Sequence, residues 1–159
     1  MEVRIAKIEE FKKLWNYSNS PTYLYFLEQL INENIEFWTV VLSNKLIGEL
    51  YIFWDSEDKD EANGTSRAYL CAYRIESEHQ GKGYGKQLMN TVLKRIKNKG
   101  FNEVTIGVDN NEFIKLEVMY KKIGFTTHVK STNVDLHNIS DSLVPIRYEE
   151  PYVLMLKKL

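Results

Sequence analysis

The chain has 159 residues, 43% of them hydrophobic and 27% charged, with a net charge of −1. This composition is ordinary for a globular protein and excludes a disordered chain, so we expect a single domain over residues 1–159. The near-neutral charge gives no electrostatic basis for nucleic-acid binding, and the one cysteine, Cys71, excludes an internal disulfide framework. No run approaches the about 20 apolar residues that cross a bilayer, and the N-terminus is charged where a signal peptide is apolar. We therefore expect a cytoplasmic protein without a membrane or nucleic-acid partner.

The first half of the chain predicts a short strand, two helices and three further strands. Apolar residues recur at helical spacing in the helices, and Ser20-Pro21 is typical of a helix start. The strands are rich in β-branched and aromatic residues, with a turn at 43–45 and a polar loop at 55–66. The expected bounds are 3–6, 8–15, 21–31, 37–42, 46–54 and 68–75.

The second half predicts alternating helices and strands. Two helices end at glycines, Gly100 and Gly124, which is typical of helix C-termini. Residues 131–150 show no periodicity that assigns them to an element. The whole pattern predicts a mixed sheet with helices on both faces, an α/β or α+β fold. The expected bounds in this half are 85–99, 104–108, 112–123, 125–130 and 152–156.

A glycine-rich turn lies between the strand that ends at Ile75 and the helix that follows. Its sequence is Gln80-Gly81-Lys82-Gly83-Tyr84-Gly85. Glycines let the backbone approach a ligand closely, and the first N–H groups of a helix have no internal partner. With the charges of Lys82 and Lys86, the turn predicts a binding site for a diphosphate.

Two common phosphate motifs do not fit this turn. A Walker A loop would need a glycine at Gln80 and Ser or Thr at Gln87. The dinucleotide fingerprint would need a third glycine at Lys86.

The turn instead matches the pattern Gln/Arg-x-x-Gly-x-Gly/Ala, and there the sequence resembles the GNAT N-acetyltransferases. A second element, Tyr120-Lys121-Lys122-Ile123-Gly124-Phe125, is similar to that family's Tyr-x-x-x-Gly-Phe. The resemblance covers about residues 70–125. It implies a mostly antiparallel central sheet and a cytoplasmic acyltransferase that uses acetyl-coenzyme A to acetylate a primary amine.

The resemblance also implies which residues bind the coenzyme. Backbone groups near Arg74 and Ile75 would pair with the pantetheine arm, main chain to main chain. Many relatives carry an asparagine seven residues before the tyrosine, where this chain has Phe113; Asn111 is a nearby substitute, out of register. The diphosphate would be held by Gln80, Gly81, Lys82, Gly83, Tyr84, Gly85 and Lys86.

Direct transfer needs a base, an oxyanion donor and a group that protonates the leaving thiolate. Tyr120 occupies the family's acid position, and a phenol with a pKa of about 10 suits a thiol near 8.5. Tyr120 also shares a helical face with Phe113, Leu116 and Ile123, so a purely structural role stays open. A backbone N–H at a bulge in the strand before the glycine turn would serve the oxyanion.

The general base is less clearly marked. Residues 67–75 contain no acid, and Tyr69 falls where some relatives have a glutamate. Glu49 interrupts an otherwise apolar run on the neighbouring strand, which makes it the best substitute; a chain of waters would serve equally.

Several alternatives remain open at this level. A non-catalytic coenzyme A-binding module, regulatory or interacting, would share the fold, and an enzyme could use another acyl group or acylate a hydroxyl. Acidic residues in the 55–61 loop could attract a cationic amine or simply be solvated. His79, His128 and His137 show no metal-ligand spacing, so we expect no metal. The expected partner is a small-molecule or protein amine, and a homodimer is allowed.

Overall fold

The computed structural model describes residues 1–15, 19–109 and 113–159. Within these residues the strands form one seven-stranded sheet, and every neighbouring pair is antiparallel except β4 and β5. The fold is the mixed, mostly antiparallel α/β type that the sequence predicts. In spatial order the strands are β1 (Glu2–Ile5), β2 (Ile35–Leu42), β3 (Lys45–Phe53), β4 (Arg67–Ile75), β5 (Glu103–Val108), β7 (Pro145–Lys158) and β6 (Thr127–Ile139).

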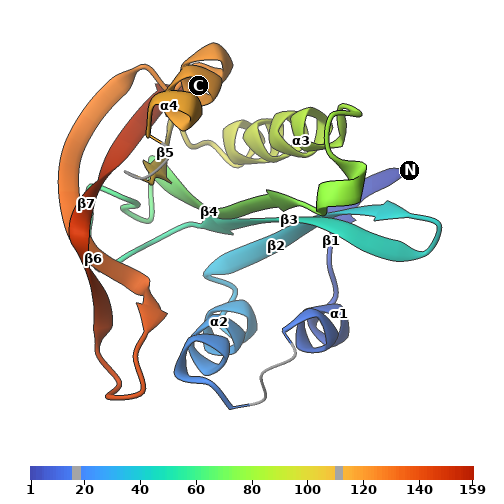
Figure 1. Ribbon diagram of the computed structural model, residues 1–159, viewed down its shortest axis with the longest axis horizontal. Coiled ribbons are helices and arrows are strands. Elements are labelled where there is room, and N and C mark those ends of the chain that lie inside the picture. Colours follow the sequence, from blue (N-terminus) through green and yellow to red (C-terminus); the bar gives the residue numbers. More distant parts are fainter. Residues whose placement is uncertain (16–18, 110–112) are drawn as a thin grey trace.

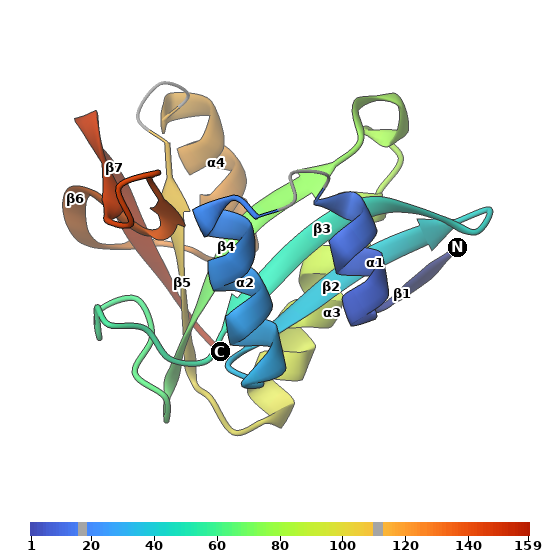
Figure 2. The same cartoon turned by 90° about the horizontal axis from the view of Figure 1, so that it is seen from below.

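Helices cover both faces of the sheet. In Figure 1, α3 and α4 lie above the sheet, whereas α1 and α2 lie below it. Figure 2 shows α1 and α2 crossing the middle strands on that lower face. No described helix is long and apolar enough to cross a membrane. The helices are α1 (Ile8–Leu14), α2 (Pro21–Ile31), α3 (Tyr84–Asn98) and α4 (Phe113–Ile123), with a short 3-10 turn at Ser77–His79.

The sequence signals for the helix starts and for the first hairpin are confirmed. The Ser20 side chain accepts the N–H of Tyr23 at 3.1 Å, and Pro21 is the first residue of α2. Ser43 and Asn44 have positive φ, as the tight turn between β2 and β3 requires. These features depend on a few neighbouring residues, so the local sequence alone predicts them.

Two hydrophobic clusters form the core, one on each face of the sheet. The upper one packs α3 and α4 on the sheet through residues such as Leu88, Val92 and Tyr120. The lower one is unusually aromatic: Phe11 and Phe26 of α1 and α2 meet Tyr51 from the sheet. The sheet is therefore fixed on both sides, and it is rigid enough to position a site at its middle strands.

The last two strands differ from the prediction. We expected strands at 125–130 and 152–156 with an unassigned segment between them, but β6 and β7 form one long hairpin through that segment. Most of its residues are half-buried or exposed on both faces, and the register shifts three times. Neither face needs an apolar row, so the alternation that marks a strand is missing.

The parallel strands β4 and β5 separate part-way along. They pair from Arg67 opposite Glu103 to Leu70 opposite Ile106, whereas β4 continues to Ile75. Ala72 has a φ of 59°, and the register with β3 shifts there. This is the bulge expected in the strand before the glycine turn, and it bends β4 away from β5.

Candidate active site

Two glycines in the left-handed region shape the turn before α3. Gly81 has a φ of 75° and Gly83 a φ of 87°, values that residues with a Cβ rarely adopt. Gly83 is the N-cap of α3, and its carbonyl accepts the N–H of Gln87 at 3.1 Å. The N–H groups of residues 84–86 precede that bond and have no acceptor inside the helix. With the helix dipole, they make the turn suited to an anion.

The turn packs closely against the end of β4 at Gly85 and is hydrogen-bonded to it through Gln80. A Cβ on Gly85 would lie 2.9 Å from the hydroxyl oxygen of Tyr73, so close packing requires glycine there. Nε2 of Gln80 donates to the carbonyl of Ile75 at 2.9 Å. The side-chain amide of Gln80 therefore holds the glycine turn against the end of β4.

A first cavity of about 730 Å³ opens in front of this turn. It is bounded by the start of β3, the end of β4, the start of α3 and part of α4. Lys82 is exposed and does not line it, and Asn111 lies outside the described residues. The predicted residues that do line it are Glu49, Arg74, Ile75, Gln80, Gly81, Gly83, Tyr84, Gly85, Lys86 and Tyr120.

The main chain of β4 faces this cavity at Ile75 rather than at Arg74. The N–H of Glu76 donates to the carbonyl of Ile47 on β3 at 2.8 Å. Main-chain groups alternate along a strand, so those of Arg74 also face β3, and those of Ile75 face away from it. Of the two residues expected beside the pantetheine arm, Ile75 has its backbone in the right direction.

Glu49 lines the same cavity, and both of its carboxylate oxygens have partners. Its Oε1 is 2.8 Å from Nη2 of Arg74, and its Oε2 accepts the Tyr51 hydroxyl at 3.1 Å. That hydroxyl in turn accepts Nε1 of Trp15 at 2.9 Å. Burial raises the pKa of Glu49, and Arg74 and Tyr51 offset part of the rise.

Tyr120 on α4 is 6% exposed and lines the first cavity. Its ring packs on Phe125, with centroids 5.9 Å apart, and its hydroxyl makes no hydrogen bond to a described residue. Burial raises the pKa of Tyr120 to about 12, so the hydroxyl keeps its proton at neutral pH. Leu116 and Ile123 pack beside it as the helical face predicts; the side chain of Phe113 lies outside the described part of the chain.

Tyr73 is a second hydroxyl at this point, and the sequence reasoning missed it. It lines the same cavity, and burial raises the pKa of Tyr73 to about 12 as well. Tyr73 follows the bulge at Ala72, where the alternation of side chains is broken. A strand pattern alone therefore places it on the wrong face.

A second cavity of about 780 Å³ lies where β4 and β5 separate. Tyr73, Arg74 and Tyr120 line both cavities, so the two spaces meet at these three side chains. The outer wall of the second cavity comes from the β6–β7 hairpin, through Asp135, Tyr148 and neighbouring residues.

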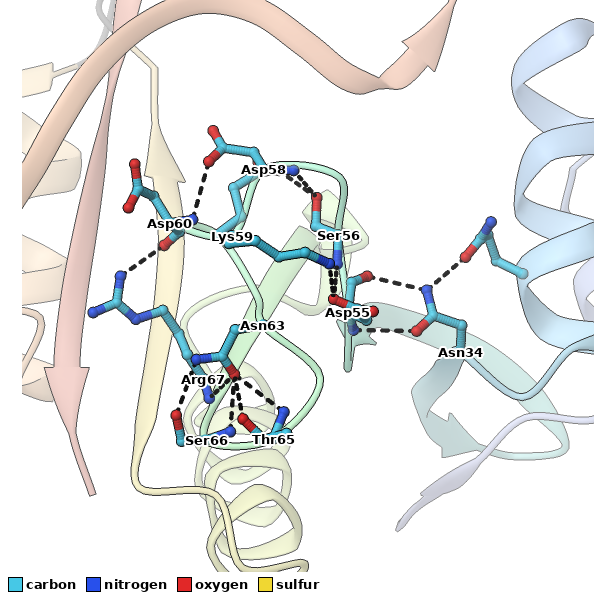
Figure 3. Close-up of polar contacts among 12 residues, drawn as sticks. Asn34, Asp55, Ser56, Asp58, Lys59, Asp60, Asn63, Thr65, Ser66 and Arg67 are labelled. Atoms are coloured by element: carbon cyan, nitrogen blue, oxygen red, sulfur yellow. Dashed lines mark hydrogen bonds and ion pairs between the residues drawn. The ribbon is translucent and has the colours of Figure 1, made fainter.

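The acidic loop between β3 and β4 is ordered by its own hydrogen bonds (Figure 3). Oδ1 of Asn63 accepts the N–H groups of Thr65, Ser66 and Arg67 at 2.9–3.1 Å. Asn34 holds the start of the loop, because its side chain bonds both the N–H and the carbonyl of Asp55 at 3.1 Å. These bonds order the backbone of the loop, whereas the side chains of Asp55 and Asp60 stay about half exposed to solvent.

Three aspartates of this loop form ion pairs, either with a lysine of the loop or with a lysine of β6. Asp55 pairs with Lys59 at 2.7 Å, and Lys130 lies 2.6 Å from Asp58 and 3.0 Å from Asp60. None of residues 55–61 lines either of the two cavities. The loop is therefore not the wall that an incoming amine would meet.

One carboxylate of the loop is buried beneath the second cavity. Oε1 of Glu61 lies 3.1 Å from Nε2 of His137, and it accepts the Ser56 hydroxyl at 2.9 Å. Nδ1 of His137 is 2.9 Å from the Tyr25 hydroxyl, and its ring stacks on Tyr69 at 5.0 Å. This cluster ties the loop, α2 and β6 together.

Three groups beside the glycine turn lie at metal-ligand distances from one another. Glu76, Glu78 and His79 each place one ligand atom within 4.8 Å of the others, a cluster that the spacing of histidines alone did not reveal. Oε2 of Glu76 is also 3.1 Å from Nζ of Lys45, so an ion there would compete with that lysine.

A bulged strand followed by a glycine-capped helix start is the arrangement that the family resemblance of the sequence led us to expect. The chain belongs to the Acetyltransferase (GNAT) family, whose sequence model matches residues 3–125. A curated relative, "N-acetyltransferase 8B" of Homo sapiens, is 30% identical over 108 residues, which are 55% of this chain and 46% of that protein. The chain thus spans less than half the length of this curated relative.

Solved structures show the same fold at low sequence identity. The ribosomal-protein-alanine N-acetyltransferase of Brucella melitensis aligns with a TM-score of 0.69 at 12% identity, over 100% of both chains. A GNAT family acetyltransferase of Elizabethkingia anophelis, solved with acetyl-CoA bound, aligns with a TM-score of 0.65 at 15% identity, over 99% of this chain and 97% of that one.

Proposed function

We propose that the chain transfers the acetyl group of acetyl-coenzyme A to a primary amine by direct attack. The observation that carries the proposal is the meeting of two cavities at Tyr73, Arg74 and Tyr120. One cavity holds an anion-binding helix start, and the other offers a separate path for an acceptor. Two substrates could therefore meet at one point without exchanging places.

The residues of the first cavity fit a coenzyme with a diphosphate. A Cβ built on Gly81 or Gly83 meets no atom within 4 Å, so the space in front of these backbone positions is open. The free N–H groups of residues 84–86 point to that space, and Lys82 and Lys86 add positive charge. The outward N–H of Ile75 is suited to pair with a carbonyl of the pantetheine arm, whereas the Ile75 carbonyl already accepts Nε2 of Gln80.

The chemistry needs few groups. Bound acetyl-coenzyme A would supply a thioester whose carbonyl carbon forms the new C–N bond as the C–S bond breaks. A main-chain N–H at the Ala72 bulge would stabilise the oxyanion. The Tyr120 hydroxyl, which keeps its proton, would donate to the departing sulfur. Since a phenol with a pKa of about 12 is a weak acid, its main contribution is a hydrogen bond to the developing thiolate.

Glu49 is our candidate for the base that removes the proton of the amine. Its raised pKa makes it a better base than an exposed glutamate, and Arg74 holds it in place. These contacts are also a constraint, because Arg74 holds Oε1 and the Tyr51 hydroxyl holds Oε2, so the carboxylate would reach the amine through a remaining lone pair or through a water. A water chain from Glu49 to the amine meets this constraint.

The test is release of free thiol from acetyl-coenzyme A, measured with the full chain across a panel of primary amines. We expect amine-dependent thiol release and an acetylated product. Coenzyme binding without turnover on any amine would support the non-catalytic module instead. Stabilisation by ATP but not by coenzyme A would contradict the assignment of the turn.

A further inference from the structure

The second cavity has a strongly acidic wall. Its lining includes four carboxylates, from Asp109, Asp135, Glu149 and Glu150. The only cationic side chain among its described lining residues is Arg74, which is already paired with Glu49 at 2.8 Å. Because these carboxylates border one cavity, their charges add to a negative potential there that favours a cation.

A tyrosine hydroxyl with no hydrogen-bond partner among the described residues faces the same space. Tyr69 is 6% exposed and lines the second cavity, and its hydroxyl bonds to no described residue. That hydroxyl lies 3.6 Å from the position of a Cβ on Gly107, so it reaches across β5 where a side chain is missing. Buried polar groups almost always have a partner, and a lone one calls for a ligand or a water.

The central carboxylate of the wall is held in a fixed orientation. Oδ2 of Asp135 accepts the Tyr148 hydroxyl at 2.9 Å, and Oδ1 accepts the N–H of His137 at 2.9 Å. The ring of His137 is anchored in turn by Glu61 and Tyr25. A carboxylate with two bonds still has free lone pairs, and a preorganised acceptor is what recognition of an ammonium group requires.

We propose that the second cavity is the acceptor site and selects amines that carry a second positive charge, with Tyr69 as the hydrogen-bond partner of the bound amine and Asp135, Glu149 and Glu150 as partners of the remote cation. This inference rests on the proposed acetyl transfer. It names a substrate class: diamines and larger polyamines, in preference to monoamines.

The reaction that this class would undergo is balanced. One nitrogen loses a proton and attacks the acetyl carbon, the C–N bond forms as the C–S bond breaks, and the sulfur leaves as the thiol. The other nitrogen stays protonated against the acidic wall. The product has one positive charge fewer than the substrate, so the wall holds it less tightly.

The test compares acceptors of equal length with one or two amino groups. Values of kcat/KM for α,ω-diamines and for the matching n-alkylamines are measured by thiol release on the wild-type chain and on Asp135→Asn. We expect the wild type to prefer the diamine by about tenfold or more, as a charge-assisted contact allows. Asp135→Asn should lose most of that preference, because kcat/KM falls much further for the diamine than for the monoamine.

Two further variants control for a general charge effect and for misfolding of the Asp135→Asn chain. Asp141→Asn makes the same charge change on an exposed part of the β6–β7 hairpin outside the cavity, and it should keep the preference. Should Asp135→Asn fail to fold, the double variant Glu149→Gln, Glu150→Gln replaces two exposed side chains and should show the same loss.

The outcomes separate this inference from the proposed function. Equal kcat/KM for diamines and monoamines, with turnover on both, would overturn the dication site and leave acetyl transfer standing. Retained preference in both acidic-wall variants would also overturn it. Coenzyme binding with no turnover on any amine would contradict the proposed function itself.

Discussion

Replacement of Tyr120 by phenylalanine separates catalysis from packing at the centre of the site. The change removes one hydroxyl that bonds to no described residue and keeps a ring that packs on Phe125. No buried partner is left unsatisfied, so we expect the free energy of unfolding to change by less than about 1 kcal/mol. That corresponds to a melting-temperature change of at most about 2–4 °C for a domain of this size.

The same change should strongly affect turnover. A positioned proton or hydrogen-bond donor contributes roughly 100-fold or more, about 2.7 kcal/mol of transition-state stabilisation. Affinity for acetyl-coenzyme A should change far less, because the thiolate exists only as the C–S bond breaks. The assay is thiol release under saturating amine, together with calorimetric titration of the coenzyme.

Two matched variants make the result interpretable. Tyr23→Phe removes a hydroxyl outside both cavities and should behave as wild type. Tyr73→Phe tests the neighbouring hydroxyl, whose pKa is also about 12. Full turnover in Tyr120→Phe would refute the reasoning, and a large loss confined to Tyr73→Phe would transfer the role to Tyr73.

Three other changes test the base, the glycine turn and the buried cluster. Glu49→Gln should lower kcat/KM near neutral pH, and the deficit should shrink as pH approaches the amine's pKa of about 10.4, where the amine loses its proton unaided. Because burial raises the pKa of Glu49, the wild-type profile should fall on the acid side above pH 4.5, the ordinary value, and that limb should be missing in the variant; identical profiles would exclude Glu49. Gly83→Val should abolish the stabilisation of about 2.7 kcal/mol that coenzyme A gives at 100 times its Kd, measured by thermal unfolding. Gly100→Val carries the same positive φ at the far end of α3 and should keep that stabilisation; equal losses would make the effect one of backbone strain. His137→Ala should cost about 3 kcal/mol, roughly 6–12 °C in melting temperature, because it leaves Glu61 buried without its partner; an unchanged melting temperature would contradict that account.

The sequence predicts those parts of the fold and site whose causes are local. The glycine turn and the Ser20 cap lie within a few residues of the groups that require them, and the structure has both in their expected places. Strands at 125–130 and 152–156 were expected, but the length of the β6–β7 hairpin was missed, because both faces of the segment between them are partly exposed and no alternation of apolar residues marks it.

The acidic wall was missed because its residues are far apart in the sequence. Its carboxylates come from positions 109, 135, 149 and 150, which only the folded hairpin brings together. The contiguous run at 55–61 was conspicuous in the sequence, yet its acids pair with Lys59 and Lys130 and line neither cavity. Tyr73 was missed because the bulge reverses the side on which its ring lies. Clusters assembled from distant segments leave no spacing to read.

The most direct measurement of the central claim follows the acetyl group itself. The full chain is incubated with acetyl-coenzyme A carrying an isotopically labelled acetyl group and with a primary diamine, and the products are analysed by mass spectrometry. The account predicts that the label appears on one nitrogen of the amine in proportion to the thiol released. Thiol release with the label recovered only as acetate, or a coenzyme that binds and stays intact with every amine, would contradict it.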